Sequence, residues 1–351
     1  MPNELRSLQY LRAVAALLVV MVHFQAPLAR LGYHGWSPRA LGSGVDMFFV
    51  ISGVVMWLST VDKNLTPGDF LLKRALRIVP MYMLITLFIA VIMFAFPWAV
   101  SNGHFDGAHV AASLLFIPWE HPDLKGHLYP VFVPGWTINA EMFFYLLFSV
   151  VLLLAVRLRI VAVALALSAL VLVGAVLHPT GSLSFYTEPY LLEFLFGLVI
   201  AAGYRATGQI GVLPSALLVT GGVAWLVLSA VFEPSVQDVD RVITWGIPAA
   251  MIVCGSMYLE RAGALRHSRI MHFLGNASYS IYMTHTIVLS ACGLVLSRLP
   301  LTPVVQQFVY RPFAMAAVVA AGCLTYLVVE KPMTRGLRAL VGPRQRRQQI
   351  A

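Results

Sequence analysis

Apolar stretches of nearly equal length follow one another along almost the whole chain, separated by short polar segments. A helix rises about 1.5 Å per residue, so about 20 apolar residues cross the roughly 30 Å hydrocarbon layer of a bilayer. The pattern therefore predicts an all-α polytopic membrane protein with about ten transmembrane helices. The predicted spans are residues 10–29, 43–61, 80–100, 135–155, 160–177, 187–203, 211–231, 242–259, 277–297 and 312–330.

The charged residues add an orientation to this picture. The chain of 351 residues is 59% hydrophobic and 11% charged, with a formal net charge of +9. Positive-inside bias and anionic headgroups explain this charge better than a nucleic-acid partner does, because the basic residues lie in short segments between apolar runs. Most of the 24 lysines and arginines fall on the cytoplasmic side when both termini do. We predict one transmembrane domain over 1–340 and a disordered basic cytoplasmic tail over 341–351.

The first span carries a cation and an imidazole on one helical face. Arg12 and His23 are eleven residues apart, which places them within about 20° around a helix and about 16 Å apart along its axis. Ionisable groups are costly in lipid, so the pair is a candidate functional site. The alternative is a packed His23 whose ring donates to a neighbouring carbonyl.

Depth along the spans divides the polar residues into an outer and an inner layer. His23 and Glu141 both lie about six residues, or about 9 Å, below the outer interface, and Asp46 lies in the first turn of the second span. A carboxylate at that depth would hold the imidazole in one tautomer. His23 is the only imidazole that we expect at this depth. Asn139 lies about 200° around the helix from Glu141, so it is expected to line a neighbouring wall with Trp136.

The alternative for Glu141 and Asp46 is a structural ion pair or a helix cap. In the inner layer, Lys73, Arg74 and Arg77 lie at helical spacing, and Arg12 enters from the first span. Guanidinium groups suit phosphates, so a phosphorylated cytosolic donor is expected to dock here. Basic residues also flank cytoplasmic span ends in general, which is the alternative reading.

Two further groups stay open on sequence alone. Tyr282 and His285 share a helical face about eight residues above the inner interface. They either line a path between the two layers or form a polar patch between helices. The outer segment 101–134 contains four histidines at spacings that match no standard metal site, so a polar, aromatic lid over a sugar-sized cleft is favoured.

Short motifs occur in a fixed order from the first span to the last. They are Arg12 to His23, Gly44-Val45-Asp46-Met47-Phe48-Phe49-Val50-Ile51-Ser52-Gly53, Arg74-x-x-Arg77-Ile78-x-Pro80, Trp136-Thr137-x-Asn139-x-Glu141, Ser278-Tyr279-Ser280-Ile281-Tyr282-x-x-His285 and Glu330-x-Pro332. In this order they resemble the acyltransferase 3 family of bacterial membrane proteins, which includes exopolysaccharide and O-antigen O-acetyltransferases.

The resemblance implies a multi-pass enzyme of the bacterial inner (cytoplasmic) membrane. Its co-substrate would be acetyl-CoA or a similar acyl-CoA from the cytosol, with no bound cofactor and no metal. The acceptor would be a sugar hydroxyl of an extracytoplasmic polysaccharide. Some relatives carry a fused extracytoplasmic domain that completes the transfer. This chain ends soon after its last span, so we expect it either to finish the reaction itself or to hand over to a separate extracytoplasmic protein.

The expected mechanism uses His23 as the base that takes the hydroxyl proton, oriented by Glu141 or Asp46. An acyl-histidine intermediate is a variant of it. Trp136 and Asn139 are expected to bind the acceptor. The rival function is a proton-coupled transporter or flippase of a polysaccharide intermediate. The expected acyl-CoA-binding residues are Arg12, Lys73, Arg74, Arg77, Tyr282 and His285.

Overall fold

The computed structural model describes residues 4–33, 35, 39–97, 103–232, 241–300 and 302–348. All regular secondary structure in these ranges is helical, which confirms the all-α prediction. Nine of the described helical segments are long and apolar enough to cross a membrane. The predicted fourth span corresponds to a shorter helix, α6 (Trp136–Val151, 16 residues), which follows the turn η3 (Val133–Gly135). The protein is therefore a polytopic membrane protein.

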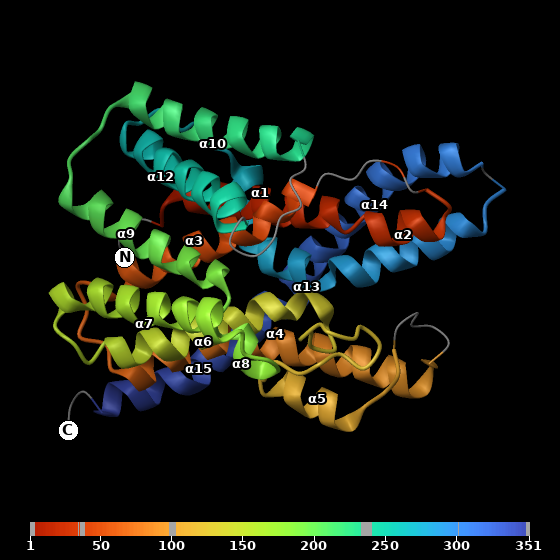
Figure 1. The fold of residues 1–351 in the computed structure, drawn as a ribbon, viewed down its shortest axis with the longest axis horizontal. Helices are drawn as coiled ribbons and strands as arrows, with labels where there is room; N and C mark the ends of the chain where they lie inside the picture. The colour runs from red at the N-terminus through yellow and green to blue at the C-terminus, as the bar shows by residue number, and fades with distance from the viewer. Residues whose placement is uncertain are drawn as a thin grey trace. The chain divides into compact units, whose positions relative to one another are not determined.

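The chain divides into two compact units, each described here by itself (Figure 1). Unit 1 comprises Met1–Lys63 and Pro189–Cys323, and unit 2 comprises Asn64–Glu188 and Leu324–Ala351. The elements that begin in unit 1 are α1 (Arg6–Val22), α2 (Gln25–Arg30), η1 (Arg39–Ser43), α3 (Gly44–Thr60), η4 (Pro189–Leu191), α9 (Leu192–Ala206), α10 (Val212–Phe232), η5 (Val242–Gly246), α12 (Ile247–Arg261), α13 (Arg269–Ser297) and α14 (Pro303–Thr325). The other elements of unit 2 are α4 (Pro67–Ala95), α5 (Gly107–Leu114), α7 (Val156–Leu177), α8 (Ser182–Phe185), η6 (Tyr326–Glu330) and α15 (Lys331–Gln348).

The helices of unit 1 pack in close pairs: α1 against α13, α3 against α9, and α10 against α12. Figure 1 shows α10 and α12 side by side. At the crossing of α3 and α9, a Cβ atom on Gly53 or on Gly197 would overlap the backbone of the other helix. Glycine is required there because only its absent side chain lets two membrane helices approach so closely.

Two helices begin well before the apolar stretches that predicted them. α4 begins at Pro67 rather than at residue 80, and the hydroxyl of Thr66 caps it by accepting a hydrogen bond from the Asp69 backbone N–H (3.1 Å). α13 begins at Arg269 rather than at residue 277. Both starts mix charged and apolar residues, so hydrophobicity alone did not reveal them, although a hydroxyl before each turn is an N-cap signal.

α15 continues to Gln348, so residues 341–348 are helical where the sequence predicted a disordered tail. Arginine and glutamine are good helix formers, and a high density of positive charge did not outweigh that propensity here. Residues 349–351 lie outside the described part of the chain.

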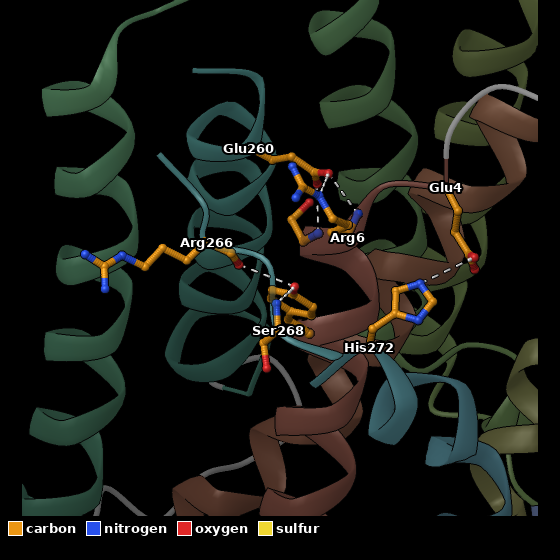
Figure 2. A network of polar contacts seen from close by, with 8 residues as sticks. Glu4, Arg6, Glu260, Arg266, Ser268 and His272 are labelled. Carbon is orange, nitrogen blue, oxygen red and sulfur yellow. Dashed lines mark hydrogen bonds and ion pairs between the residues drawn. The ribbon is translucent and has the colours of Figure 1, made fainter. Parts of the chain in front are cut away.

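A carboxylate from another helix caps the start of α1. The residue before α1 provides no side-chain cap, and Glu260 of α12 takes its place by accepting the backbone N–H groups of Arg6 (2.9 Å) and Ser7 (2.8 Å). An anion is favourable at a helix N-terminus because the first N–H groups have no partner within the helix. The hydroxyl of Tyr10 also accepts the backbone N–H of Ser268 at 2.6 Å. Figure 2 shows how these contacts join the starts of α1 and α13 to the end of α12.

Candidate active site

The first predicted span is broken at His23. α1 ends at Val22 and α2 begins at Gln25. Pro27 explains the break, because proline has no N–H for the carbonyl of His23 four residues earlier and its ring crowds that carbonyl. His23 therefore stands at the C-terminal cap of α1 instead of inside a continuous helix.

The backbone fixes the tautomer of His23. Its ring Nδ1 lies 2.7 Å from the carbonyl oxygen of Val19. A carbonyl oxygen only accepts hydrogen bonds, so Nδ1 carries the hydrogen and Nε2 of the neutral ring carries the lone pair. This is the contact expected of a packed histidine, and it leaves the second nitrogen available for chemistry. A backbone carbonyl thus does the orienting that we predicted for Glu141 or Asp46.

A second imidazole lies against the first. The ring centroids of His23 and His285 are 4.7 Å apart, with an interplanar angle of 76°. Nδ1 of His285 donates to the carbonyl oxygen of Tyr282 at 2.5 Å, so its Nε2 also carries a lone pair. His285 is fully buried. Its Nε2 has no hydrogen-bond partner among the described residues, and such an atom is expected to receive a ligand or a water.

The two histidines meet because α1–α2 and α13 run side by side in the same direction. Near their starts, Gly275 lies against the backbone of Gln9, and further along, Gly293 lies against Pro27. Residue numbers rise together along both helices, which makes the pair parallel. The first and ninth of ten spans have this relation in the predicted topology.

The depth assigned to His285 from the sequence was wrong. His285 lies sixteen residues after Arg269, about 24 Å along α13, and His23 lies seventeen residues after Arg6, about 26 Å along α1. His285 is therefore level with His23, and His23 is not the only imidazole at its depth. The error follows from placing the start of α13 at residue 277.

Asp46 is held in a buried ion pair. Its two carboxylate oxygens accept hydrogen bonds from Nε (3.0 Å) and Nη2 (3.2 Å) of Arg241. The guanidinium of Arg241 also lies over the rings of Tyr190 (5.6 Å) and Trp245 (5.5 Å). Asp46 is fully buried. The structure thus contains the ion-pair alternative at Asp46. Among the described residues, Asp46 makes no hydrogen bond to His23 of the kind that the predicted orienting role requires.

Sequence reasoning missed Arg241 and Glu193. Arg241 counted only as an outer loop cation, because the predicted span began one residue later. Glu193 lies within an apolar run and is fully buried beside Asp46 and Arg241. The absence of a side chain at Gly246 makes room for it, since a Cβ there would lie 2.9 Å from Oε1 of Glu193. An acidic residue inside an apolar span was the signal that could have found it.

In unit 2, Glu141 belongs to a cluster with Arg74. The hydroxyl of Tyr145 donates to the carboxylate of Glu141. The guanidinium of Arg74 lies 5.9 Å from the Tyr145 ring centroid and 5.6 Å from that of Phe70, and it interacts with the charge of Glu141. The structure therefore joins residues that we had placed in separate layers. The cause is again the early start of α4, which embeds Arg74 in a long helix.

The other predicted residues are distributed over both units. Lys73 is exposed, and Arg77 and Arg12 are half-buried. The predicted donor-binding set is divided between unit 1 (Arg12, Tyr282 and His285) and unit 2 (Lys73, Arg74 and Arg77). Within unit 1, the Tyr282 ring centroid lies 5.4 Å from that of His285.

Asn139 in unit 2 is the second unsatisfied polar group at a predicted position. Its side chain is 1% exposed, and neither amide atom has a hydrogen-bond partner among the described residues. Trp136, one turn earlier on α6, is half-buried. Buried amide groups are nearly always paired, so this one is a candidate contact for a bound molecule.

The outer segment of unit 2 contains backbone-bound histidines. Nδ1 of His121 accepts the backbone N–H groups of Asp123 (3.1 Å) and Leu124 (3.2 Å), and its ring lies 5.1 Å from that of His109. Burial lowers the pKa of His121, His109 lowers it further, and Asp123 opposes this. His104 pairs with Asp123. In the described part of the chain, no group of three or more acidic, histidine or cysteine side chains is arranged to hold a metal ion.

Comparison with known proteins identifies the kind of enzyme that holds these residues. The family model described as an acyltransferase domain matches residues 5–327. The chain belongs to the acyltransferase 3 family. It is therefore an acyltransferase, and the predicted family and enzyme class are confirmed. This favours the enzyme over the rival transporter.

Two curated relatives have similar sequences. The exopolysaccharide production protein ExoZ of Rhizobium meliloti is 35% identical over 310 residues, which cover 85% of this chain and 90% of ExoZ. Protein 2 in the picA locus of Rhizobium radiobacter is 30% identical over 157 residues, which cover 40% of this chain and 78% of that protein. No solved structure gives a significant match.

Proposed function

We propose that this acyltransferase moves an acetyl or similar acyl group from cytosolic acyl-CoA to a hydroxyl of an exported or cell-surface polysaccharide. The reaction would take place across the bacterial cytoplasmic membrane. The relative named as an exopolysaccharide production protein, 35% identical over most of both chains, supports the polysaccharide acceptor. The cluster of basic residues on the predicted cytoplasmic side supports a phosphorylated donor.

The observation that carries the proposal is the imidazole of His23. Its ring is held by the Val19 carbonyl with the Nε2 lone pair available, and the side chain is only partly buried. A sugar hydroxyl is a poor nucleophile near neutral pH, whereas a thioester is already activated. The group that the reaction needs from the protein is a base with a pKa near the working pH, and imidazole is that group.

The step balances with this single base. Nε2 of His23 takes the proton of the acceptor hydroxyl while the hydroxyl oxygen attacks the thioester carbonyl carbon. A carbon–oxygen bond forms, the carbon–sulfur bond breaks, and its electron pair goes to the CoA sulfur. The proton then passes from the imidazole to that sulfur, which leaves an ester, CoA thiol and a neutral histidine. An acyl-histidine intermediate would divide the same chemistry into two steps.

Binding roles follow from the chemistry of the two substrates. A guanidinium binds phosphate through two parallel hydrogen bonds, so Arg74 and Arg77 in unit 2 would pair with phosphates of a donor. Arg12 in unit 1 is proposed for phosphate binding on its own account. Trp136 would offer a ring face to a sugar, and Asn139 would donate to and accept from sugar hydroxyls.

Purified protein, labelled acetyl-CoA and isolated exopolysaccharide test the proposal. We expect label in the polymer and one CoA thiol released per label transferred. CoA release without label in the polymer would mean that the acyl group stays on the protein or passes to water, and that transfer to the polymer needs a separate extracytoplasmic protein. Absence of any turnover, together with measurable flux of a polysaccharide intermediate through proteoliposomes, would contradict the proposed function.

A further inference from the structure

His285 is a buried imidazole whose second nitrogen is unused. Its Nδ1 is occupied by the Tyr282 carbonyl, and its Nε2 is buried without a hydrogen-bond partner in the described structure. A buried acceptor without a hydrogen-bond donor costs free energy, so a donor is expected to reach it at some stage of the catalytic cycle. The ring lies against His23, the proposed base, at a centroid distance of 4.7 Å.

His23 has a neutral partner where other catalytic histidines have an anionic one. In acid–histidine pairs a carboxylate stabilises the positive charge that forms on the ring. Here Nδ1 of His23 is bound to the uncharged Val19 carbonyl. Asp46, the carboxylate predicted for the role in unit 1, has both oxygens bound to Arg241. The lone pair on Nε2 of His285 therefore adjoins the charge that the reaction would create.

Two imidazoles in contact are expected to hold one extra proton between them, not two. Two positive charges about 5 Å apart repel strongly in surroundings of low dielectric constant, so the second protonation is suppressed. The other titratable or charged groups on these helices are Arg6, Tyr10 and Arg12 on α1, Arg30 on α2, Asp46 on α3, Arg269, His272, Tyr279, Tyr282 and Cys292 on α13, and Tyr310, Arg311 and Cys323 on α14.

We propose that His285 is a positioning residue that shares with His23 the single proton taken from the acceptor hydroxyl. This inference rests on the proposed function above. When Nε2 of His23 takes that proton, the lone pair on Nε2 of His285 accepts a hydrogen bond from it, directly or through one water. The proton then leaves for the CoA sulfur as the carbon–sulfur bond breaks. His285 ends the cycle neutral, with no net gain or loss of protons.

Two substitutions separate proton sharing from structural support. His285→Gln places an amide oxygen near the position of Nε2 and keeps the acceptor. His285→Asn places an amide N–H near the position of Nδ1, so it keeps the bond to Tyr282 and loses the acceptor. Under the proposal, His285→Gln retains about a tenth or more of wild-type turnover, and His285→Asn loses about 10²-fold. KM for acyl-CoA changes little in either variant.

The pH dependence of turnover distinguishes the two roles, because a purely structural role of His285 would leave the pH profile unchanged. On the acid side, wild-type activity falls as the pair takes up its proton. In His285→Asn this fall is expected at lower pH, because the proton on His23 is no longer shared, and His285→Gln is expected to lie between the two. Should His285→Asn fold poorly in a thermal unfolding assay, the comparison of His285→Gln with the wild type still tests the shift.

A reversed ranking, with His285→Asn more active than His285→Gln, would show that His285 only supports Tyr282. Unchanged pH profiles in both variants would overturn the inference in the same way. Failure of the proposed function gives a different result, because the wild-type protein itself then transfers no acyl group from acyl-CoA.

Discussion

Two polar clusters, the His23–His285 pair of unit 1 and the Glu141–Arg74 cluster of unit 2, are held in different ways. In unit 1, His23 and His285 are neutral rings fixed by carbonyls of their own helices. In unit 2, Glu141 is held by the side chain of Tyr145, and Arg74 lies against aromatic faces. A base must gain and lose a proton easily, and a neutral ring on a rigid backbone suits that task. Binding an anionic donor requires a permanent charge, and Arg74 provides one beside the rings of Phe70 and Tyr145 and the carboxylate of Glu141.

The largest effect is expected at the unit 1 pair. His23→Ala should lower acyl transfer by about 10²–10⁴-fold, the usual contribution of a general base, with the protein still folded and inserted. Labelled transfer and thermal unfolding measure the two properties. His178→Asn in unit 2 is the matched control, because His178 is an exposed histidine with φ 44°, a conformation that asparagine tolerates. Near-normal transfer by His23→Ala would show that His23 is not the base.

A smaller effect of a different kind is expected at Arg74. Arg74→Lys keeps the charge but loses bidentate geometry and contact with the rings of Phe70 and Tyr145. We expect KM for acyl-CoA to rise about tenfold with kcat nearly unchanged, as for loss of about 1.4 kcal/mol of binding. Arg157→Lys, an exposed arginine of the same unit, is the control. A loss confined to kcat would assign Arg74 to the chemical step and weaken the contrast between the units.

A substitution at Glu141 tests whether this carboxylate affects donor binding or the proposed base. Glu141→Gln keeps an acceptor for Tyr145 but removes a negative charge that competes for Arg74. We expect KM for acyl-CoA to fall about threefold, in the range of a partly screened ion pair, with the pH profile unchanged. If instead the pH profile moves and KM does not, Glu141 acts on His23, as the depth argument from the sequence predicted.

His121 is held to the backbone in the opposite sense to His23. Its Nδ1 accepts hydrogen bonds from backbone N–H groups, whereas Nδ1 of His23 donates one to a backbone carbonyl. The pKa of His121 in the folded protein is lowered from 6.5, so the ring binds a proton more readily when the segment around it is locally unfolded. The neutral His121 ring therefore stabilises the folded segment above pH 6.5, and this stabilisation is lost as the pH falls below that value. Hydrogen exchange at the Asp123 and Leu124 amides, corrected for intrinsic rates, should be faster at about pH 5.5 than at about pH 7.5. The same pH dependence in His121→Asn would exclude His121 as its source.

Hydrophobic periodicity was sufficient to predict most of the spans, and the ordered motifs were sufficient to predict the family. Helix starts were harder to predict, because α4 and α13 begin with mixed charged and apolar residues and only the hydroxyl caps mark where they start. That single error in α13 hid the contact between His23 and His285. Pairing across the chain, as between Asp46 and Arg241, depends on which helices become neighbours. No local pattern in one sequence encodes that choice.

The central proposal is that an acyl group passes from a donor on the predicted cytoplasmic side to an acceptor on the other side, with the imidazole of His23 as the base for the transfer. Proteoliposomes with one known orientation, labelled acetyl-CoA on the N-terminal side and polysaccharide only on the opposite side, test it most directly. We predict label in the polysaccharide with the wild-type protein, and none above background with His23→Ala. Transfer only when donor and acceptor share one side, or equal transfer by His23→Ala, would contradict the account.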